Sequence, residues 1–243
     1  AGSGARGSGS AVNAKRQLPA RRADVQGLAA GSAERALTGD CEWAAMKAAT
    51  TKSGKTAEVA LQEAIATIGE NMNLRRYEVI DVGQGAIVSY VHSAVKPGMG
   101  RIGVLVALES AADADKLQDV GKQVAMHVAA AAPKAATRDE VDPADVERER
   151  DVLTAQAKES GRPDNIIEKM VEGRMRKFYE ESVLVEQAFV IDPDKTVGAA
   201  LDEAGAAAGG AVVVKGFHRL ALVEGVEKKE SDFAAEVAAA VKG

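Results

Sequence analysis

The sequence predicts an α+β protein built around an antiparallel sheet. Three β-rich runs, at residues 77–82, 86–92 and 102–108, follow one another through short loops, which suits antiparallel neighbours. Helical patterns precede and follow these runs, so helices and strands mix along the chain. Aromatic residues make up only 3% of the sequence, and the abundance of Ala and Val favours small-residue, helix-rich packing over a β-sandwich.

Length and composition exclude several classes of protein. A chain of 243 residues that is 46% hydrophobic is long enough to bury a core and too apolar for wholesale disorder. No run approaches the ~20 apolar residues of a membrane span, so we expect no membrane partner. The single cysteine, Cys41, excludes a disulfide framework and a Cys-based zinc site, which favours a reducing, cytoplasmic compartment.

The charge distribution argues against strong nucleic-acid binding. The net charge is −5, whereas binding through counterion release needs a surplus of cations. Residues 1–40 nevertheless hold six Lys and Arg against three Asp and Glu. Such a basic surplus is also found in RNA-contacting arms, so an RNA contact by this segment stays open as an alternative.

The first fifty residues have the weakest pattern. Residues 1–10, with the sequence AGSGARGSGS, have the composition of a flexible linker. Pro19 is incompatible with the interior of a helix that begins before it. We expect a helix over residues 23–36 and a second, short one over residues 40–49.

Beyond this stretch the periodicity is clear. Thr56 caps a helix that runs to Gly69. The segment Gly83-Gln84-Gly85 separates the first two strand runs and is a hairpin signal. A loop over residues 93–100 leads into the third strand, and Asp113 opens a long amphipathic helix.

Residues 143–182 predict a helical hairpin inserted into the chain. Pro143 suits a first helical turn, and Ser160-Gly161-Arg162-Pro163 breaks the helix into two arms. Apolar residues repeat near every seventh position, which favours a short antiparallel coiled coil. We expect the remaining elements to be a strand over residues 185–191, a helix over 196–207, a strand over 212–223 and a last helix from Ser231.

The motifs suggest no enzyme with covalent chemistry of its own. Residues 98–103 spell the G-x-G-x-x-G pattern of dinucleotide-binding proteins, but a strand rather than a helix follows, so we interpret them as a loop between strands. No P-loop, nucleophile elbow or pair of spaced carboxylates stands out. We therefore expect no catalytic residue, no metal and no cofactor.

The three histidines occupy different settings, and none belongs to a zinc-binding H-x-x-x-H pair. His127 lies at the edge of an apolar helix face, so we interpret it as a core histidine. His218 follows a strand-like run and has no visible partner. His92 ends a strand where a Gly- and Pro-containing loop begins, and the pattern leaves open both an interface role and a structural role.

Six sequence blocks carry a family resemblance. In this order, over about residues 54–243, they resemble bacterial elongation factor Ts, and the alphaproteobacterial branch in particular. The blocks are IGENMNLRR at 68–76, SYVH at 89–92, IGVLV at 102–106, AMHVAA at 125–130, EKMVEGRM at 168–175 and, within residues 224–237, EGVE followed by SDFAAEV.

The resemblance implies a guanine-nucleotide exchange factor for elongation factor Tu. Such a factor binds Tu in its GDP-bound and nucleotide-free forms and weakens nucleotide binding by linkage, without a cofactor of its own. Relatives form either one-to-one or two-to-two complexes with Tu, so the resemblance allows a homodimer. The alternative that the residues leave open is a Tu-binding or RNA-contacting scaffold without exchange activity.

The resemblance also implies which residues contact Tu. Ile68, Gly69 and His92 match positions that face the nucleotide-binding domain of Tu. Val190 matches an apolar contact of the second core subdomain. The C-terminal docking module of the family corresponds to the helix that contains Asp232 and Phe233.

One motif departs from the family pattern. The family places T-D-F-V-A after a strand, and its Asp and Phe act as a wedge near the magnesium site of Tu. Here Gln17 and Leu18 stand where Asp and Phe belong, and Pro19 follows. We therefore expect a degraded wedge, and binding to Tu that survives better than exchange. The broken periodicity of residues 1–53 fits an altered reading frame or a degenerate segment, and we expect the family's N-terminal helical domain to be missing.

Periodicity and resemblance together divide the chain into five parts. The expected architecture is an antiparallel-sheet core of two related subdomains with an inserted helical hairpin and a C-terminal helix. The parts are a linker-like start with a degraded N-terminal core subdomain (1–53), a core of helix, strands and helix (54–142), the coiled-coil hairpin (143–182), the remainder of the C-terminal core subdomain (183–225) and a C-terminal helical module (226–243).

Overall fold

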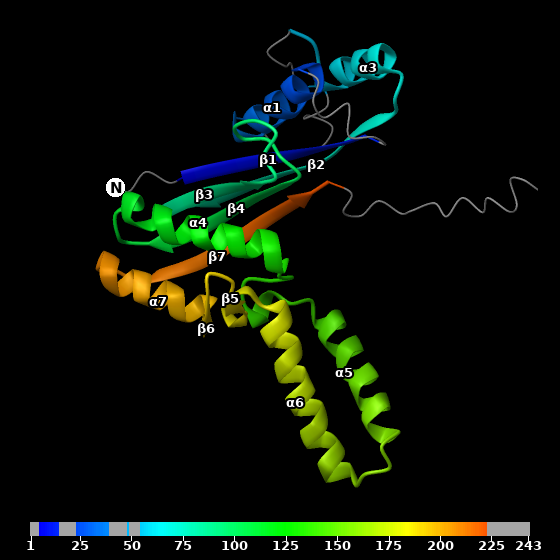
Figure 1. The fold of residues 1–243 in the computed structure, drawn as a ribbon, viewed down its shortest axis with the longest axis vertical. Helices are drawn as coiled ribbons and strands as arrows, with labels where there is room; N and C mark the ends of the chain where they lie inside the picture. Colours follow the sequence, from blue (N-terminus) through cyan, green and yellow to red (C-terminus); the bar gives the residue numbers. More distant parts are fainter. Residues whose placement is uncertain (1–4, 15–22, 39–47, 49–53, 223–243) are drawn as a thin grey trace, which may run out of the picture.

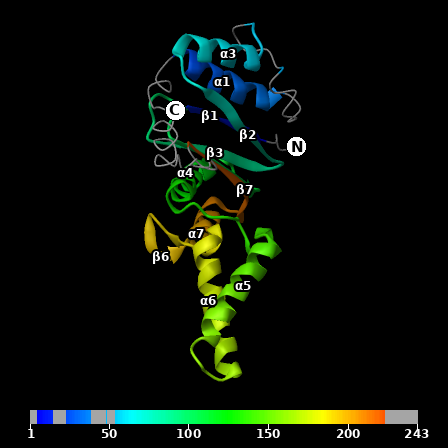
Figure 2. The ribbon, with the colours of Figure 1, turned by 90° about the vertical axis from the view of Figure 1, so that its right-hand side faces the viewer.

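The structure is a computed structural model that describes residues 5–14, 23–38, 48 and 54–222. Its core stacks in four layers, with helices outside and two antiparallel sheets between them (Figure 1; Figure 2). The outer helices on one side are α1 (Ala23–Thr38) and α3 (Ala57–Ile68). They cover a two-stranded sheet made of β1 (Ala5–Ala14) and β2 (Met72–Val82).

The second sheet has three antiparallel strands in the order β3-β4-β7. Helices α4 and α7 cover the face that points away from the first sheet (Figure 1). These findings confirm the α+β class and the antiparallel pairing. The bounds are β3 (Gly85–His92), β4 (Ile102–Ser110), α4 (Ala114–Ala131), α7 (Val197–Ala208) and β7 (Val212–Ala221).

Helix ends follow the local signals in the sequence. The Thr56 hydroxyl accepts a hydrogen bond from the Val59 N–H at the start of α3, and the Asp113 carboxylate accepts one from the Asp115 N–H at the start of α4. Thr196 caps α7 in the same way. The helix expected over residues 23–36 is α1, while the helices expected over residues 40–49 and from Ser231 lie outside the described residues, apart from the single helical position 48.

Residues 5–10 of the Gly/Ser-rich start belong to the strand β1, so the prediction of a flexible linker was wrong for these residues. Successive residues of β1 face opposite neighbours, the serines facing α1 and the glycines facing the second sheet. The Ser8 hydroxyl donates to the Ala33 carbonyl of α1 at 2.6 Å, whereas Gly7 faces the second sheet, where a Cβ would lie 2.6 Å from Ile87 Cγ2. The next Gly-Ser pair repeats the pattern. Glycine therefore lets the two sheets approach closely, a role that composition alone does not reveal.

The segment Gly83-Gln84-Gly85 does not form the expected hairpin between neighbouring strands. β2 pairs with β1 and β3 pairs with β4, so the segment carries the chain from one sheet to the other. Gly85 has a φ of 135°, and a Cβ there would lie 1.9 Å from the Leu108 carbonyl oxygen of β4. Gly85 is needed for the passage between sheets, and the pairing partner is set by distant residues.

The strand expected over residues 185–191 is shorter than predicted, and a 3-10 turn takes the place of its first residues. Residues Leu184–Glu186 form a 3-10 turn, η3, and only Ala188–Phe189 form a strand, β5. The Gln187 N–H donates to the Val183 carbonyl at 3.1 Å, which closes a turn where an extended chain was expected. β5 pairs with β6 (Asp192–Thr196), which the sequence did not predict.

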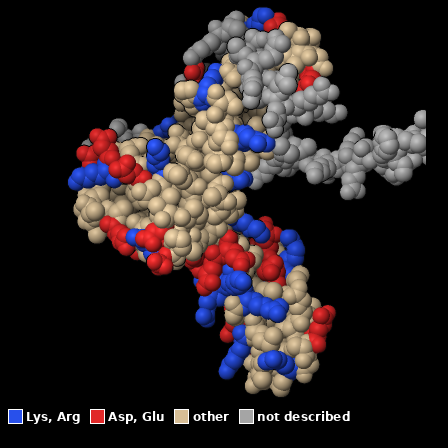
Figure 3. Space-filling model, in the orientation of Figure 1, with Lys and Arg blue, Asp and Glu red and all other residues tan. Residues whose placement is uncertain are grey.

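Two helices project from the core as a helical hairpin (Figure 1; Figure 2). They are α5 (Pro143–Lys158) and α6 (Asp164–Ser182), joined by a turn in which Gly161 adopts a left-handed φ of 65°. A short 3-10 turn, η2 (Arg138–Glu140), precedes them. The hairpin has its own small cluster of buried side chains, which are Ala157, Ile167, Val171 and Met175. On the face in Figure 3, positively and negatively charged side chains are mixed along the hairpin.

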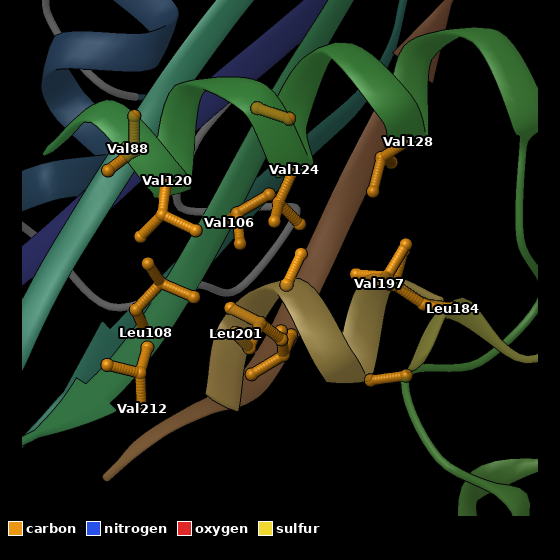
Figure 4. Packing of buried hydrophobic residues seen from close by; sticks show 14 of the residues in the cluster. Val88, Val106, Leu108, Val120, Val124, Val128, Leu184, Val197, Leu201 and Val212 are labelled. Carbon is orange, nitrogen blue, oxygen red and sulfur yellow. The ribbon is translucent and has the colours of Figure 1, made fainter. Parts of the chain in front are cut away.

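The main core lies between the three-stranded sheet and its two helices. Helices α4 and α7 lie side by side on one face of the sheet, where they cover Val106 and Leu108 (Figure 4). The valines of α4 at positions 120, 124 and 128 face Val197 and Leu201 of α7. Among the described helices, none is long and apolar enough to cross a membrane.

We expect Leu108→Ala to destabilise the fold by about 2–5 kcal/mol, because Leu108 is fully buried and its loss leaves a cavity between sheet and helices. Urea unfolding monitored by circular dichroism measures the change. Val59→Ala on α3, where the side chain is 42% exposed, is the control and should change stability by less than about 0.5 kcal/mol. Equal effects of the two substitutions would contradict the placement of the core.

Candidate functional site

The first predicted contact, Ile68 with Gly69, lies where α3 ends. Gly69 adopts a left-handed conformation with a φ of 74°, and its N–H donates to the Ile65 carbonyl at 2.8 Å. Ile68 is half-buried against the apolar cluster that contains Met72, while Gly69 is exposed. The turn therefore presents a glycine backbone to solvent on a well-anchored helix end.

His92, the second predicted contact, is an exposed side chain at the end of β3. Its Nδ1 lies 3.3 Å from the Tyr90 hydroxyl, and its carbonyl accepts a hydrogen bond from the Arg101 N–H at 3.0 Å. Gly100 packs so closely that a Cβ there would lie 2.5 Å from the same carbonyl. The loop thus holds the strand end in place while the imidazole stays accessible.

Val190, the third predicted contact, lies in the two-residue turn between β5 and β6. Its side chain is 51% exposed, and its neighbour Ile191 is 48% exposed, while Phe189 before them is buried. The sequence prediction named Val190 alone. Ile191 belongs to the same exposed apolar pair, and the Asp-Pro pair that follows it was the available turn signal.

Ion pairs of Lys195 attach β6, the strand that follows this turn, to α7. The Lys195 ammonium lies 2.5 Å from a carboxylate oxygen of Glu203 and 3.2 Å from one of Asp192. These two carboxylates, Glu203 first, raise the pKa of Lys195. A groove of about 600 Å³ between α4 and α7 begins beside the turn and is lined by Phe189, Ile191 and a row of small α7 residues.

His127 is a core histidine, which confirms its interpretation from the sequence. It is fully buried, its Nε2 lies 2.8 Å from the Gln187 side-chain oxygen, and its Nδ1 accepts a hydrogen bond from the Val190 N–H at 3.2 Å. Burial lowers the pKa of His127 from its usual value of 6.5, and the hydrogen bond with Gln187 acts in the opposite direction. The ring is therefore neutral at neutral pH.

The buried imidazole predicts a pH dependence of stability. Because the folded-state pKa of His127 lies below 6.5, the unfolded chain binds more protons in this range, and stability is lost as the pH falls below about 6.5. We expect the free energy of unfolding to decline from pH 7 to pH 5, and His127→Asn to remove part of that decline. Urea unfolding at each pH measures both curves. Parallel curves for the two proteins would contradict a depressed pKa.

His218 has partners that the sequence did not reveal. Its Nε2 lies 3.2 Å from the Val79 carbonyl, and its Nδ1 lies 3.6 Å from a Glu78 carboxylate oxygen. Both partners belong to β2, so His218 joins the two sheets. It is a structural histidine rather than an unpartnered one.

The predicted contacts lie on three different elements. Ile68 and Gly69 end a helix of the first layer, His92 ends a strand of the second sheet, and Val190 lies beyond that sheet beside α7 (Figure 1). In the part of the chain that the structure describes, no hydrogen bond or ion pair joins these places, and no cluster of His, Cys, Asp and Glu is arranged to hold a metal. The predicted site residues Gln17, Leu18, Asp232 and Phe233 lie outside the described residues.

Comparison with known proteins shows the family of this chain. The profile of the family described as Elongation factor TS matches residues 19–224. A protein named Elongation factor Ts from Parvibaculum lavamentivorans is 54% identical over 233 residues, which are 96% of this chain and 76% of the relative. Proteins of the same name from Rhizobium etli and Rhizobium johnstonii match with the same identity and the same coverage. The chain therefore belongs to the elongation factor Ts family, the guanine-nucleotide exchange factors of elongation factor Tu.

Proposed function

We propose that the chain holds elongation factor Tu at three separate places. These are the Ile68–Gly69 turn, the imidazole of His92 and the Val190–Ile191 turn. The observation that carries the proposal is the exposed apolar pair at the last of these, on a turn that β6, α4 and α7 hold in place. Apolar side chains displayed together on an ordered turn are typical of a protein contact.

Contacts on separate elements suit an exchange factor. A rigid body that touches Tu at several places favours a Tu conformation that fits all of them, and it weakens GDP binding to the same extent that GDP weakens its own binding. This action makes and breaks no covalent bond and requires no cofactor in the chain. The partners we propose are Tu·GDP and nucleotide-free Tu.

The finer features of the family are also proposals for this chain. We propose that the hairpin of α5 and α6 is a short coiled coil, that the chain acts in the cytoplasm, and that it forms a homodimer where its complex with Tu is two-to-two. The mixed charges along the hairpin support a protein contact rather than strong nucleic-acid binding (Figure 3).

We expect the wedge position to limit exchange rather than binding. In Gln17→Asp/Leu18→Phe the carboxylate and the ring of the family motif are restored, so the rate of GDP release from Tu should rise by about tenfold, equivalent to ~1.4 kcal/mol. The affinity for nucleotide-free Tu should change by less than about twofold, because the three proposed contacts lie elsewhere. Stopped-flow release of a fluorescent GDP and titration calorimetry measure the two quantities.

Two outcomes would overturn this division of roles. An unchanged release rate in the restored variant would show that Gln17 and Leu18 do not limit exchange. A large gain in affinity would show that the wedge region contributes to binding as well. Gln17→Asn/Leu18→Ile is the matched control, because it changes both side chains without restoring the charge or the ring.

A further inference from the structure

The turn that carries Val190 and Ile191 rests on a buried polar side chain. His127 comes from α4, is fully buried, and lies against the Phe189 ring with 5.8 Å between ring centroids. Its Nδ1 lies 3.2 Å from the Val190 backbone nitrogen. The Val190 side chain points to solvent, while its N–H ends on a group inside the core.

The surrounding hydrogen bonds determine which nitrogen of His127 carries the proton. The Gln187 side-chain nitrogen donates to the Glu181 carbonyl at 2.7 Å, so the Gln187 oxygen faces His127. An amide oxygen only accepts, so the proton of His127 lies on Nε2. This leaves Nδ1 as an acceptor, and the Val190 N–H is the donor it meets.

Gln187 is itself fixed at several points. Its side chain is buried, its backbone carbonyl accepts from the Val197 N–H at 3.0 Å, and its backbone N–H closes the turn with Val183. The chain of bonds from Glu181 through Gln187 and His127 to Val190 therefore connects α6, the residue that follows η3, α4 and the β5–β6 turn. The hydrogen bond between His127 and Gln187 is buried, and the other two are partly buried, so the surrounding core restricts the positions of the bonded groups.

We propose that His127 is a positioning residue that sets the Val190–Ile191 turn for its contact with elongation factor Tu. The proposal rests on the contact at Val190 put forward above as part of the proposed function. His127 is buried and does not touch the partner. It acts by supplying the acceptor that the Val190 N–H needs, so that the two exposed apolar side chains keep one orientation before Tu arrives.

Two variants of similar polarity separate positioning from packing. In His127→Asn, the side-chain oxygen lies close to the position of Nδ1 and accepts from Val190. In His127→Gln, the longer side chain reaches the Nε2 side, contacts Gln187 and leaves the Val190 N–H without its acceptor. Both variants of the full chain lose the ring, so a role in packing alone affects them equally.

The experiment measures hydrogen exchange of the Val190 amide in the free chain and affinity for nucleotide-free Tu. We expect His127→Asn to keep both within about twofold, and His127→Gln to speed exchange and weaken Tu binding by about tenfold, as loss of one buried hydrogen bond allows. Urea unfolding confirms that both variants are folded. Equal losses in the two variants, or a protected Val190 amide in His127→Gln, would overturn the proposal.

Two further measurements keep the proposal distinct from the function it rests on. In the unsubstituted chain, nitrogen-15 spectra of the imidazole should show the proton on Nε2, and a proton on Nδ1 would refute the proposal without any variant. The affinity of Val190→Glu tests the contact itself. If that variant binds Tu normally, the proposed contact fails and the role of His127 in Tu binding fails with it. If Val190→Glu binds weakly and His127→Gln binds normally, only the role of His127 fails.

Discussion

We expect Val190→Glu to weaken binding of elongation factor Tu by at least about thirtyfold, equivalent to ~2 kcal/mol. The Val190 side chain is 51% exposed in the free chain, so a carboxylate there stays hydrated and the fold is unaffected. In the complex, the same carboxylate loses water without gaining a partner, and this desolvation is costly. Titration calorimetry with nucleotide-free Tu measures the affinity.

The matched control for this substitution is Val213→Glu. Val213 is 55% exposed on β7, so the same chemical change is made at a surface apolar residue outside the proposed contacts. It should leave the affinity within about twofold. Equal losses from the two substitutions would indicate a general effect of charge, and an unaffected Val190→Glu would remove this turn from the interface.

His92→Ala serves as a second probe of the interface, with a smaller expected effect. Truncation of an exposed imidazole removes a contact but buries no charge, so we expect a loss of about threefold to tenfold in affinity. The two substitutions lie on different elements without shared partners, so their effects should add. If neither substitution changes the affinity, the contacts implied by the family do not apply to this chain.

The largest effect on stability is expected from Gly85→Ala. The added Cβ would overlap the Leu108 carbonyl oxygen at 1.9 Å, and the φ of 135° is strained for any residue with a side chain. The obstacle is the backbone of the central strand of the three-stranded sheet. Neither this strand nor residue 85 can therefore move aside without a large cost in free energy. We expect a loss of more than about 4 kcal/mol, enough to unfold much of the population.

Gly83→Ala is the control for this prediction. Gly83 lies two residues earlier in the same connection, and a Cβ there would meet no atom within 4 Å. It should change the free energy of unfolding by less than about 1 kcal/mol. Thermal and urea unfolding of both variants measure the difference, and a well-folded Gly85→Ala protein would contradict the passage of the chain between the sheets as described.

Local signals in the sequence were sufficient for the ends of α3, α4 and α7 and insufficient for the strand pairing. Thr56, Asp113 and Thr196 cap helices with their own side chains, so the bounds of α3, α4 and α7 were predictable from a few neighbouring residues. The pairing of β2 with β1 depends on residues about seventy positions away in the sequence. The glycines at residues 83 and 85 predict a hairpin from local sequence alone, but in the structure they mark a change of sheet.

The strand β1 shows why composition misled the prediction. Glycine and serine favour flexible segments on average, but in β1 the serines bond α1 and the glycines face the second sheet. That role exists only because another sheet lies close to the strand. The same limit applies to His218, whose partners on β2 are about 140 residues earlier and leave no trace in the local pattern.

The structural setting of the candidate contacts was only partly predictable from the sequence. The sequence predicts a helix end at Gly69 and a strand end at His92, and both residues lie as expected. Val190 was placed within a strand and lies in a turn, because η3 shortens that strand. The link from His127 to Val190 spans 63 residues and depends on packing, so no sequence pattern reveals it.

As a member of the elongation factor Ts family, this chain accelerates nucleotide exchange on elongation factor Tu. The most direct test is the release of a fluorescent GDP from Tu, followed by stopped-flow fluorescence with increasing concentrations of the chain and an excess of unlabelled GDP. We expect a release rate that rises with concentration to a plateau, together with a complex that withstands gel filtration when nucleotide is removed. A release rate equal to that of Tu alone at every concentration would contradict an exchange activity of this chain.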